Sequence, residues 1–275
     1  MSTTITQADK AERFLRLHRR GEPLLMPNAW DLGSVAILAS LDFQALATTS
    51  SGHAATLGRL DGSVTREEAL AHAAALAGAT DLPVSADLEN AFADDPDGVA
   101  ETIRLARETG LAGCSVEDYS GRDEDPIYER DVARERVLAA AESAHAGPVR
   151  LVLTARAENH VHGRDDLSDT IARLQSYQEA GADVLFAPGL ATADGIRRVV
   201  ESVDRPVNVL ARPGMPSTAE LAKLGVARVS VGGAFAFAAL GALCEAAEEL
   251  RDRGTYGYLE RTAAGVRAAR AAFRR

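Results

Sequence analysis

Eight short apolar runs alternate with helix-like segments along this 275-residue chain, and this alternation limits the possible folds more than any other feature. The runs are mostly apolar and rich in Val, Leu or Ala, which is typical of strands buried on both faces of a parallel sheet. They cover residues 24–27, 45–49, 83–87, 113–117, 151–155, 184–187, 206–210 and 228–231.

Segments with helical periodicity lie between these runs, at 66–78, 99–108, 132–144, 167–180, 192–200 and 218–224. Several end in glycine before the next strand, as at Gly110 and Gly181, which is common helix C-cap chemistry. Eight β/α units with short loops predict an α/β fold, a (β/α)8 TIM barrel that forms one domain over residues 1–275. A doubly wound sheet is the alternative, but the GxGxxG fingerprint that it favours after an early strand does not occur.

Two further helical segments, 234–251 and 258–274, follow the eighth strand, so residues 234–275 form a predicted C-terminal helical extension. In the second segment, Leu259, Ala263, Val266 and Phe273 fall on one stripe, which Arg270 interrupts. A helix beyond a complete barrel has no core of its own to cover. We therefore expect it to pack on its own barrel or on that of a neighbouring subunit.

Composition excludes several classes of protein. The net charge of −10 argues against a general binder of nucleic acids or anionic membranes. Cys114 and Cys244 lie far apart without a CxxC pattern, so neither a disulfide framework nor a zinc knuckle is indicated. No apolar run reaches the roughly 18 residues that span a bilayer, and the first residues are polar rather than signal-like. We expect a soluble, cytoplasmic protein with no membrane or nucleic-acid partner.

Two of the predicted strands end in carboxylates, in the segments 85–89 (Ser-Ala-Asp-Leu-Glu) and 115–118 (Ser-Val-Glu-Asp). Alternate residues of a strand share a face, so Asp87 and Glu89 point the same way if the strand continues to residue 89. Glu117 faces the same side of its own strand as Ser115, and Asp118 faces the other. In a barrel, the inward-facing acids would meet at the C-terminal mouth, where active sites lie.

These acids predict a Mg²⁺ site, because Mg²⁺ prefers oxygen ligands and keeps several of its waters. Asp87 is the expected direct ligand, with Glu89 and Glu117 acting through water. The alternative is that the acids form ion pairs or helix N-caps at the barrel rim.

Four other features are candidates for ligand binding. Arg156 ends the fifth strand and would bind a carboxylate or phosphate in bidentate fashion, or else pair structurally with Glu158 or a neighbouring acid. The segment 48–52 (Thr-Thr-Ser-Ser-Gly) offers backbone N–H groups to an anion or forms a polar turn. Asp61 is a metal-shell acid or a turn residue. Asn208 interrupts an apolar strand, so it faces the site or makes a hydrogen bond in the core.

The motifs together resemble the isocitrate lyase/phosphoenolpyruvate mutase superfamily, in the family's order and over about residues 10 to 260. They are 27–31 (Pro-Asn-Ala-Trp-Asp), 49–52 (Thr-Ser-Ser-Gly), 85–90 (Ser-Ala-Asp-Leu-Glu-Asn), 113–118 (Gly-Cys-Ser-Val-Glu-Asp), 153–158 (Leu-Thr-Ala-Arg-Ala-Glu), 186–189 (Phe-Ala-Pro-Gly) and 206–210 (Pro-Val-Asn-Val-Leu). The resemblance implies a (β/α)8 barrel whose last helix is often exchanged between subunits of a homodimer or homotetramer. It also implies Mg²⁺, for which Mn²⁺ could substitute, and a 2-oxo acid or its enolate as the small carboxylate substrate.

The resemblance also implies roles for individual residues. By motif position, the substrate-carboxylate binders are Ser51 and Gly52, the metal-shell acids are Asp61, Asp87, Glu89 and Glu117, the substrate-binding arginine is Arg156, and the strand-seven amide is Asn208.

The chain departs from the family in the loop after the fourth strand. The lyase branch has a Lys-Lys/Arg-Cys-Gly-His loop there, whereas residues 119–126 read Tyr-Ser-Gly-Arg-Asp-Glu-Asp-Pro. The mutase branch has an Asp-Lys pair and a Lys-x-Asn loop, but here Asp118 is followed by Tyr119, and Phe186-Ala-Pro188 replaces the mutase histidine after strand six. Tyr119 and Arg122 are the remaining candidates for proton donation or closure, and Tyr is a weak acid near neutral pH.

The favoured hypothesis is a Mg²⁺-dependent lyase that cleaves a C–C bond in a small 2-oxo- or 2-hydroxy-carboxylate through a pyruvate-type enolate. Methylisocitrate lyase and oxaloacetate decarboxylase are the corresponding activities, and decarboxylation demands least from the altered loop. Arg156, Glu117 and Tyr119 are the predicted catalytic residues, and Arg156 with the Ser51–Gly52 amides would hold the carboxylate. The alternatives are a phosphonopyruvate-type P–C mutase or hydrolase, and a non-catalytic barrel that binds a carboxylate metabolite, because fold does not determine function.

Overall fold

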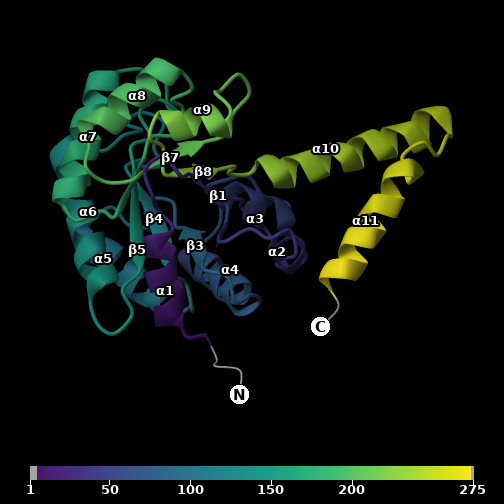
Figure 1. Ribbon diagram of the computed structural model, residues 1–275, viewed down its shortest axis with the longest axis horizontal. Coiled ribbons are helices and arrows are strands. Elements are labelled where there is room, and N and C mark those ends of the chain that lie inside the picture. Colours follow the sequence, from purple (N-terminus) through teal and green to yellow (C-terminus); the bar gives the residue numbers. More distant parts are fainter. Residues whose placement is uncertain (1–4, 274–275) are drawn as a thin grey trace.

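The computed structural model describes residues 5–273 and confirms the (β/α)8 barrel expected from the sequence (Figure 1). Within this range, eight parallel strands pair in the order β1-β8-β7-β6-β5-β4-β3-β2. Their bounds are β1 (Leu24–Met26), β2 (Leu46–Ala47), β3 (Val84–Asp87), β4 (Gly113–Glu117), β5 (Val152–Arg156), β6 (Val184–Phe186), β7 (Val207–Leu210) and β8 (Arg228–Ser230). A parallel bridge from Asn28 to Ala47, with Ala29 N donating to Ala47 O at 2.7 Å, joins the two ends of the sheet.

Helices surround the barrel, and α10, η1 and α11 come after the last strand. Their bounds are α1 (Gln7–Arg16), α2 (Leu32–Ala39), α3 (Ser50–Thr56), α4 (Arg66–Gly78), α5 (Pro96–Arg107), α6 (Arg130–His145), α7 (Leu167–Glu179), α8 (Ala193–Ser202), α9 (Thr218–Lys223), α10 (Ala234–Glu248), the π-helix η1 (Glu249–Arg253) and α11 (Leu259–Ala272). In the described part of the chain, no helix is both long and apolar enough to cross a bilayer.

The helices α1, α2 and α3 were not predicted, and their side-chain caps explain why they form. Thr6 and Asp31 make capping boxes with the third residues of α1 and α2, which satisfies N–H groups that would otherwise lack partners. Thr49 caps α3 by accepting a hydrogen bond from Gly52 N. The segment 48–52, considered as a possible polar turn, is therefore the start of a short helix, and β2 ends before it.

Helix α1 closes the N-terminal end of the barrel. Phe14 on α1 is fully buried, and it packs with the strand starts in a cluster that includes Ala112 and Val152. Gly113 makes this approach possible, because a Cβ at that position would lie 2.8 Å from the Phe14 ring and 2.6 Å from Val152 O. The open end of the barrel is therefore the opposite one, where the strands have their C-termini.

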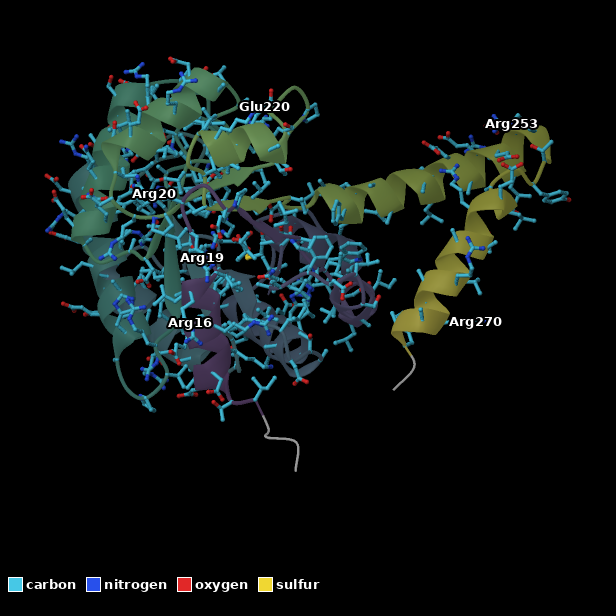
Figure 2. The ribbon with its side chains drawn as sticks, in the orientation of Figure 1. Arg16, Arg19, Arg20, Glu220, Arg253 and Arg270 are labelled. Carbon is cyan, nitrogen blue, oxygen red and sulfur yellow. The ribbon has the colours of Figure 1, made fainter. Side chains whose placement is uncertain are left out.

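The C-terminal helices extend away from the barrel and then fold back (Figure 1). Helix α10 continues into η1, and Gly254 ends it with a φ of +59°. Figure 2 shows Arg253 at this turn and Arg270 near the other end of α11. Residues of α11 contact α2. The large apolar side chains exposed along this extension are Phe235, Phe237, Leu240, Leu243, Leu250, Tyr256, Leu259, Val266 and Phe273.

Candidate active site

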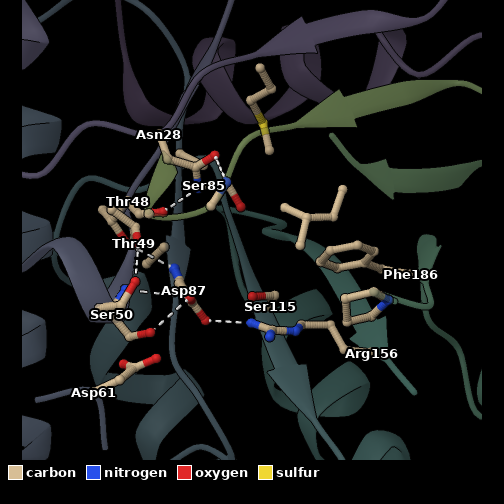
Figure 3. A pocket seen from close by; sticks show the side chains of 18 of the residues that line it. Asn28, Thr48, Thr49, Ser50, Asp61, Ser85, Asp87, Ser115, Arg156 and Phe186 are labelled. Carbon is tan, nitrogen blue, oxygen red and sulfur yellow. Dashed lines mark hydrogen bonds and ion pairs between the residues drawn. The ribbon is translucent and has the colours of Figure 1, made fainter. Parts of the chain in front are cut away.

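A cavity of about 200 Å³ opens at the C-terminal end of the barrel (Figure 3). It is the natural place for a small-molecule site in this fold, because residues at the strand ends and the βα loops converge there. The lining residues include Met26, Asn28, Ala47, Thr48, Thr49, Ser50, Ser51, Asp61, Ser85, Asp87, Ser115, Arg156, Phe186, Pro188, Leu210, Arg228 and Gly233.

Arg156, the last residue of β5, is the centre of the site. Its Nη1 lies 2.7 Å from Asp87 Oδ1, and its Nη2 lies 2.9 Å from Glu117 Oε2 and 2.7 Å from Glu158 Oε1. The Phe186 ring lies 5.4 Å from the guanidinium carbon. Burial opposes its charge, but the carboxylates of Glu117, Glu158 and Asp87 raise the pKa of Arg156 well above its usual value. The predicted structural pair with Glu158 or a neighbouring acid is therefore present with Glu158, and also with Asp87 and Glu117, which the sequence did not name.

Asp87 ends β3 and is held from two directions. Its Oδ2 accepts a hydrogen bond from Ser50 Oγ at 3.2 Å, and its backbone N–H donates to Thr48 Oγ1 at 2.9 Å. Figure 3 shows the Asp87 carboxylate between Ser50 on one side and Arg156 on the other. Thr48 and Ser50 thus orient the acid that the sequence predicts as the direct metal ligand. In the sequence, the only indication of a role for Thr48 and Ser50 is their place in the hydroxyl-rich segment 48–52.

Several acids around Asp87 have raised pKa values. Burial raises the pKa of Glu117 well above its usual value, against the opposing effect of Arg156. Burial, followed by the charges of Asp87 and Asp61, raises the pKa of Glu89 to about 8. Asp61 is exposed as a residue, yet desolvation of its carboxyl and the Asp87 charge raise its pKa too. One arginine therefore does not compensate the negative charge of this cluster.

A hard divalent cation fits this excess of negative charge, since it would favour the ionised form of every acid in the cluster. Among the described residues, no three His, Cys, Asp or Glu side chains form a preassembled metal-binding group. Asp87 with its neighbours would hold Mg²⁺ through few direct ligands and several waters, which is the usual arrangement for this ion.

The position of Glu89 differs from the sequence expectation. Strand β3 ends at Asp87, and Glu89 has a φ of +49°, so the strand does not continue to residue 89. Ala91 and Phe92 also have positive φ values, at 63° and 56°. The chain therefore turns in a left-handed conformation after β3, and Glu89 does not extend the inward face of that strand. Its carboxyl acts on the site through its charge rather than as a lining group.

The predicted carboxylate binders occupy different environments. Ser51 lines the cavity, and its Oγ lies 3.2 Å from Thr49 Oγ1. Gly52 is buried, and its N–H donates to Thr49 Oγ1 at 3.3 Å as part of the α3 cap. The Gly52 amide thus already has a partner.

Asn208 and Tyr119 do not line the cavity. Asn208 is 1% exposed, donates to Ser230 Oγ at 2.9 Å and accepts from Arg228 Nε at 2.9 Å, so it makes the core hydrogen bonds that were one of its two predicted roles. Tyr119 stacks on His162 with 4.0 Å between ring centroids. Partial burial and the charge of Asp123 raise the pKa of Tyr119.

Asp118 faces away from the cavity, as the strand alternation predicts. It is 2% exposed and accepts hydrogen bonds from Tyr177 Oη at 2.6 Å, Arg173 Nη1 at 3.2 Å and Glu158 N at 2.8 Å. Burial raises the pKa of Asp118, and the bond from Tyr177 opposes that effect. The bond to Glu158 N fixes the backbone directly after Arg156, so Asp118 supports the site from behind.

The loop between β4 and α6 folds against the neighbouring loop. Tyr119 forms an antiparallel bridge with Ile127. Arg122 Nη1 lies 3.2 Å from Asp94 Oδ1, and Tyr128 Oη donates to the same carboxylate. Asp94 thereby connects this loop to the segment between β3 and α5.

A parallel eight-stranded barrel with an arginine-centred carboxylate cluster at its C-terminal mouth defines a class of TIM-barrel proteins built for small polar ligands. Residues 14–251 match the family model for phosphoenolpyruvate phosphomutase, and the chain belongs to this family, within the isocitrate lyase/phosphoenolpyruvate mutase superfamily.

Three similar proteins illustrate the family. A solved structure of a putative lyase/mutase from Burkholderia cenocepacia J2315 is 53% identical, with a TM-score of 0.90 and 92% of each chain covered. The 2-methylisocitrate lyase of Bacillus subtilis (strain 168) is 30% identical over 216 residues, which cover 74% of this chain and 67% of the relative. The oxaloacetate decarboxylase of Chromohalobacter salexigens is 28% identical over 260 residues, covering 90% and 88%.

Proposed function

We propose that this protein is a Mg²⁺-dependent lyase that cleaves a C–C bond in a small 2-oxo- or 2-hydroxy-carboxylate through a pyruvate-type enolate. The observation that carries the proposal is Arg156 at the cavity mouth, paired with Asp87 and Glu117 beside acids whose charge it does not fully compensate. The similarity to a methylisocitrate lyase and to an oxaloacetate decarboxylase supports a C–C lyase.

In this proposal, Asp87 would hold Mg²⁺ or Mn²⁺ directly, and Glu89, Glu117 and Asp61 would hold it through water. The bound cation would supply Lewis-acid stabilisation of several kcal/mol to negative charge developing on the substrate oxygens. Arg156 binds and orients the substrate carboxylate by exchanging one of its three acid partners for it.

Ser51 and Tyr119 have supporting roles in the proposal. Ser51 lines the cavity, where its hydroxyl can bind a carboxylate oxygen. Tyr119 begins the loop that follows Glu117, and its raised pKa keeps its phenol protonated near neutral pH. Tyr119 lies outside the cavity, so the proposal requires its loop to bring the phenol to the substrate, where it would act as a proton donor to the enolate carbon rather than as a base.

Calorimetry with oxalate, a mimic of the enolate, tests the site. We expect oxalate to bind wild-type protein only when Mg²⁺ is present, and Asp87→Ala to lose this binding. Asp194→Ala is the matched control, because it removes an acid that is exposed on α8 and, among residues 5–273, pairs with Arg197 alone. Equal oxalate affinity in the Asp87 variant and in the control would refute the proposed metal site.

A substrate screen followed by NMR then identifies the reaction. Oxaloacetate, alkylmalates and methylisocitrate test C–C cleavage, and phosphonopyruvate tests P–C chemistry. A phosphonopyruvate-type mutase or hydrolase is the second candidate, which the family description favours. A barrel that binds but does not turn over a carboxylate is the third, and binding of oxalate without consumption of any screened compound would support it.

We also propose that the protein is a homodimer or homotetramer in which the extension 234–275 packs on a neighbouring subunit. The exposed apolar side chains along α10 and α11 support this proposal, because water-exposed apolar surface of this extent is typical of protein interfaces. Leu243 on α10 is 64% exposed. Light scattering should show an oligomer for wild-type protein and a smaller species for Leu243→Glu, and a wild-type monomer would contradict the proposal.

A further inference from the structure

The floor of the cavity carries a second arginine that the proposed function does not use. Arg228 opens β8, lines the cavity and is 3% exposed. Its Nη1 lies 3.1 Å from His18 Nε2, in the segment that follows α1 at the closed end of the barrel. Arg228 therefore lies at the deep end of the cavity, whereas Asp87 and Arg156 lie at its mouth.

Every hydrogen-bond partner of Arg228 in the described chain is neutral. Nε donates to Asn208 Oδ1 at 2.9 Å, and Nη2 donates to Thr154 Oγ1 at 3.1 Å. The third partner, His18, lies 2.8 Å from Phe14 O through Nδ1, so Nδ1 donates there and Nε2 accepts from Arg228. Burial and the Arg228 charge lower the pKa of His18 to about 3, which keeps this imidazole uncharged at neutral pH.

Arg228 thus remains a buried cation without a counter-charge. Arg173 is also buried, but it pairs with Asp118 and Asp169, and the partly exposed Arg156 pairs with three carboxylates. Arg136 is buried as well, and three backbone carbonyl oxygens accept its hydrogen bonds. Burial and the Arg156 charge lower the pKa of Arg228 to about 9, so it is protonated near neutral pH. Removing a charge from water without a partner is costly, and an anion in the cavity would offset that cost. A guanidinium has five N–H donors, and three are engaged, which leaves two for such an anion.

The walls between the mouth and the floor leave room for a ligand. Ala47, Ser85 and Ser115 line the cavity, and all three are small. The volume of about 200 Å³ is several times that of one water, so the cavity can hold a small organic acid.

We propose that Arg228 forms an anion subsite at the floor of the cavity, which takes the distal carboxylate of a dicarboxylate substrate whose 2-oxo acid end lies at Asp87 and Arg156. This inference rests on the proposed function and narrows its substrate class to acids with a second carboxylate. A substrate bound in this way spans the cavity between the two arginines and supplies Arg228 with the carboxylate partner that its neutral neighbours do not provide.

Calorimetry with matched ligands tests the subsite in the presence of Mg²⁺. The ligand pairs are oxaloacetate with 2-oxobutanoate and 2-oxoglutarate with 2-oxopentanoate, in which a methyl group replaces the distal carboxylate. If Arg228 makes a charge-assisted hydrogen bond to the distal carboxylate, at least one of the two dicarboxylates should bind wild-type protein more tightly than its methyl analogue, by about tenfold or more. Arg228→Gln should reduce this preference to below about twofold and leave oxalate affinity unchanged, because oxalate reaches only the mouth.

Three controls separate this role from a structural one. Arg228→Lys keeps the charge and should retain part of the dicarboxylate preference. Arg198→Gln removes an exposed arginine on α8 and should change nothing. Thermal unfolding measured by circular dichroism shows whether each variant is folded.

Some outcomes would overturn the inference. These are an unchanged dicarboxylate preference in Arg228→Gln, a wild-type protein without any preference, and an equal loss of oxalate and dicarboxylate binding in the variant. If formate binding depends on Arg228 but the protein shows no preference for dicarboxylates, the subsite binds a free anion, and its proposed role in substrate binding is overturned. A protein that shows the preference but consumes no substrate would contradict the proposed lyase activity and leave the subsite intact.

Discussion

Replacing Arg156 with glutamine should destabilise the protein in a way that depends on both pH and Mg²⁺. The side chains of Glu158, Glu117 and Asp87 are 4%, 9% and 19% exposed, and Arg156 is the cation that pairs with all three. Removing one partner of a buried ion pair costs about 3–5 kcal/mol, because it leaves uncompensated charge. We expect the free energy of unfolding to fall by about this amount at pH 8, and glutamine keeps at most a hydrogen bond to one of the acids.

The sign of the pH dependence follows from the carboxyl groups. Burial already raises the pKa values of Glu117 and Glu158, and Arg156 opposes that effect, so its loss raises them further. Between the unfolded and folded pKa values, the folded state binds more protons than the unfolded state, and stability falls as pH rises. The destabilisation should therefore be smaller at pH 5.5 than at pH 8, because protonation neutralises the acids.

Denaturant unfolding of wild-type and variant protein at both pH values, with and without Mg²⁺, measures these effects. The uncompensated acids of the variant should bind Mg²⁺ at least as well as those of the wild type, so Mg²⁺ should reduce the loss of stability. A ligand at 100 times its dissociation constant stabilises the folded state by about 2.7 kcal/mol. Arg122→Gln is the control, since its pair with Asp94 is 48% and 67% exposed and should contribute below about 1 kcal/mol. A loss that is independent of pH and not reduced by Mg²⁺ would refute the idea that Arg156 compensates a cation-binding acid cluster.

Three further predictions concern the support of the site. Asp118→Ala should destabilise the protein by about 3–5 kcal/mol in denaturant unfolding, since it leaves buried Arg173 and the Glu158 N–H without this acceptor; a loss below about 1 kcal/mol would contradict the assigned role. Gly113→Ala should lower the melting temperature by several degrees because its Cβ overlaps Phe14 and Val152 O, and an unchanged value would show that α1 moves freely. The pKa of His18 is lowered to about 3 in the fold, so between about pH 6.5 and 3 the unfolded state binds more protons than the folded state. The free energy of unfolding should therefore fall as pH decreases through this window. Acid-titrated unfolding should show a smaller slope for His18→Gln.

The sequence predicted the barrel well because its strands are buried on both faces. The mostly apolar run 113–117 coincides with β4, and all eight predicted runs contain the observed strands or overlap them. Strand alternation also placed Asp118 behind the sheet correctly, because the direction of a side chain follows from the strand period. The same rule did not apply to Glu89, because it required a strand that continues to residue 89, whereas β3 ends at Asp87 and a left-handed turn follows.

Contacts between distant segments could not be predicted in this way. Arg156 was expected to bind a ligand or to pair with Glu158 or a neighbouring acid, and only the barrel identifies these acids as Asp87 from β3 and Glu117 from β4. Ser50 reaches Asp87 only because α3 begins beside the end of β3. Arg228 carried no sequence signal, because a lone arginine at the start of a strand is ordinary until its surroundings are known.

What the sequence by itself determined is the kind of fold and the family: the spacing of apolar runs specifies the β/α alternation, and the motifs at the strand ends specify the acids and the arginine of the mouth. Only the tertiary structure decided how charge is balanced inside the barrel. Closure of the sheet brings Arg156 against three carboxylates and leaves Arg228 among neutral partners. The physical reason is that periodicity is a local property of the chain, whereas the energy of a buried charge depends on every group that the fold places around it.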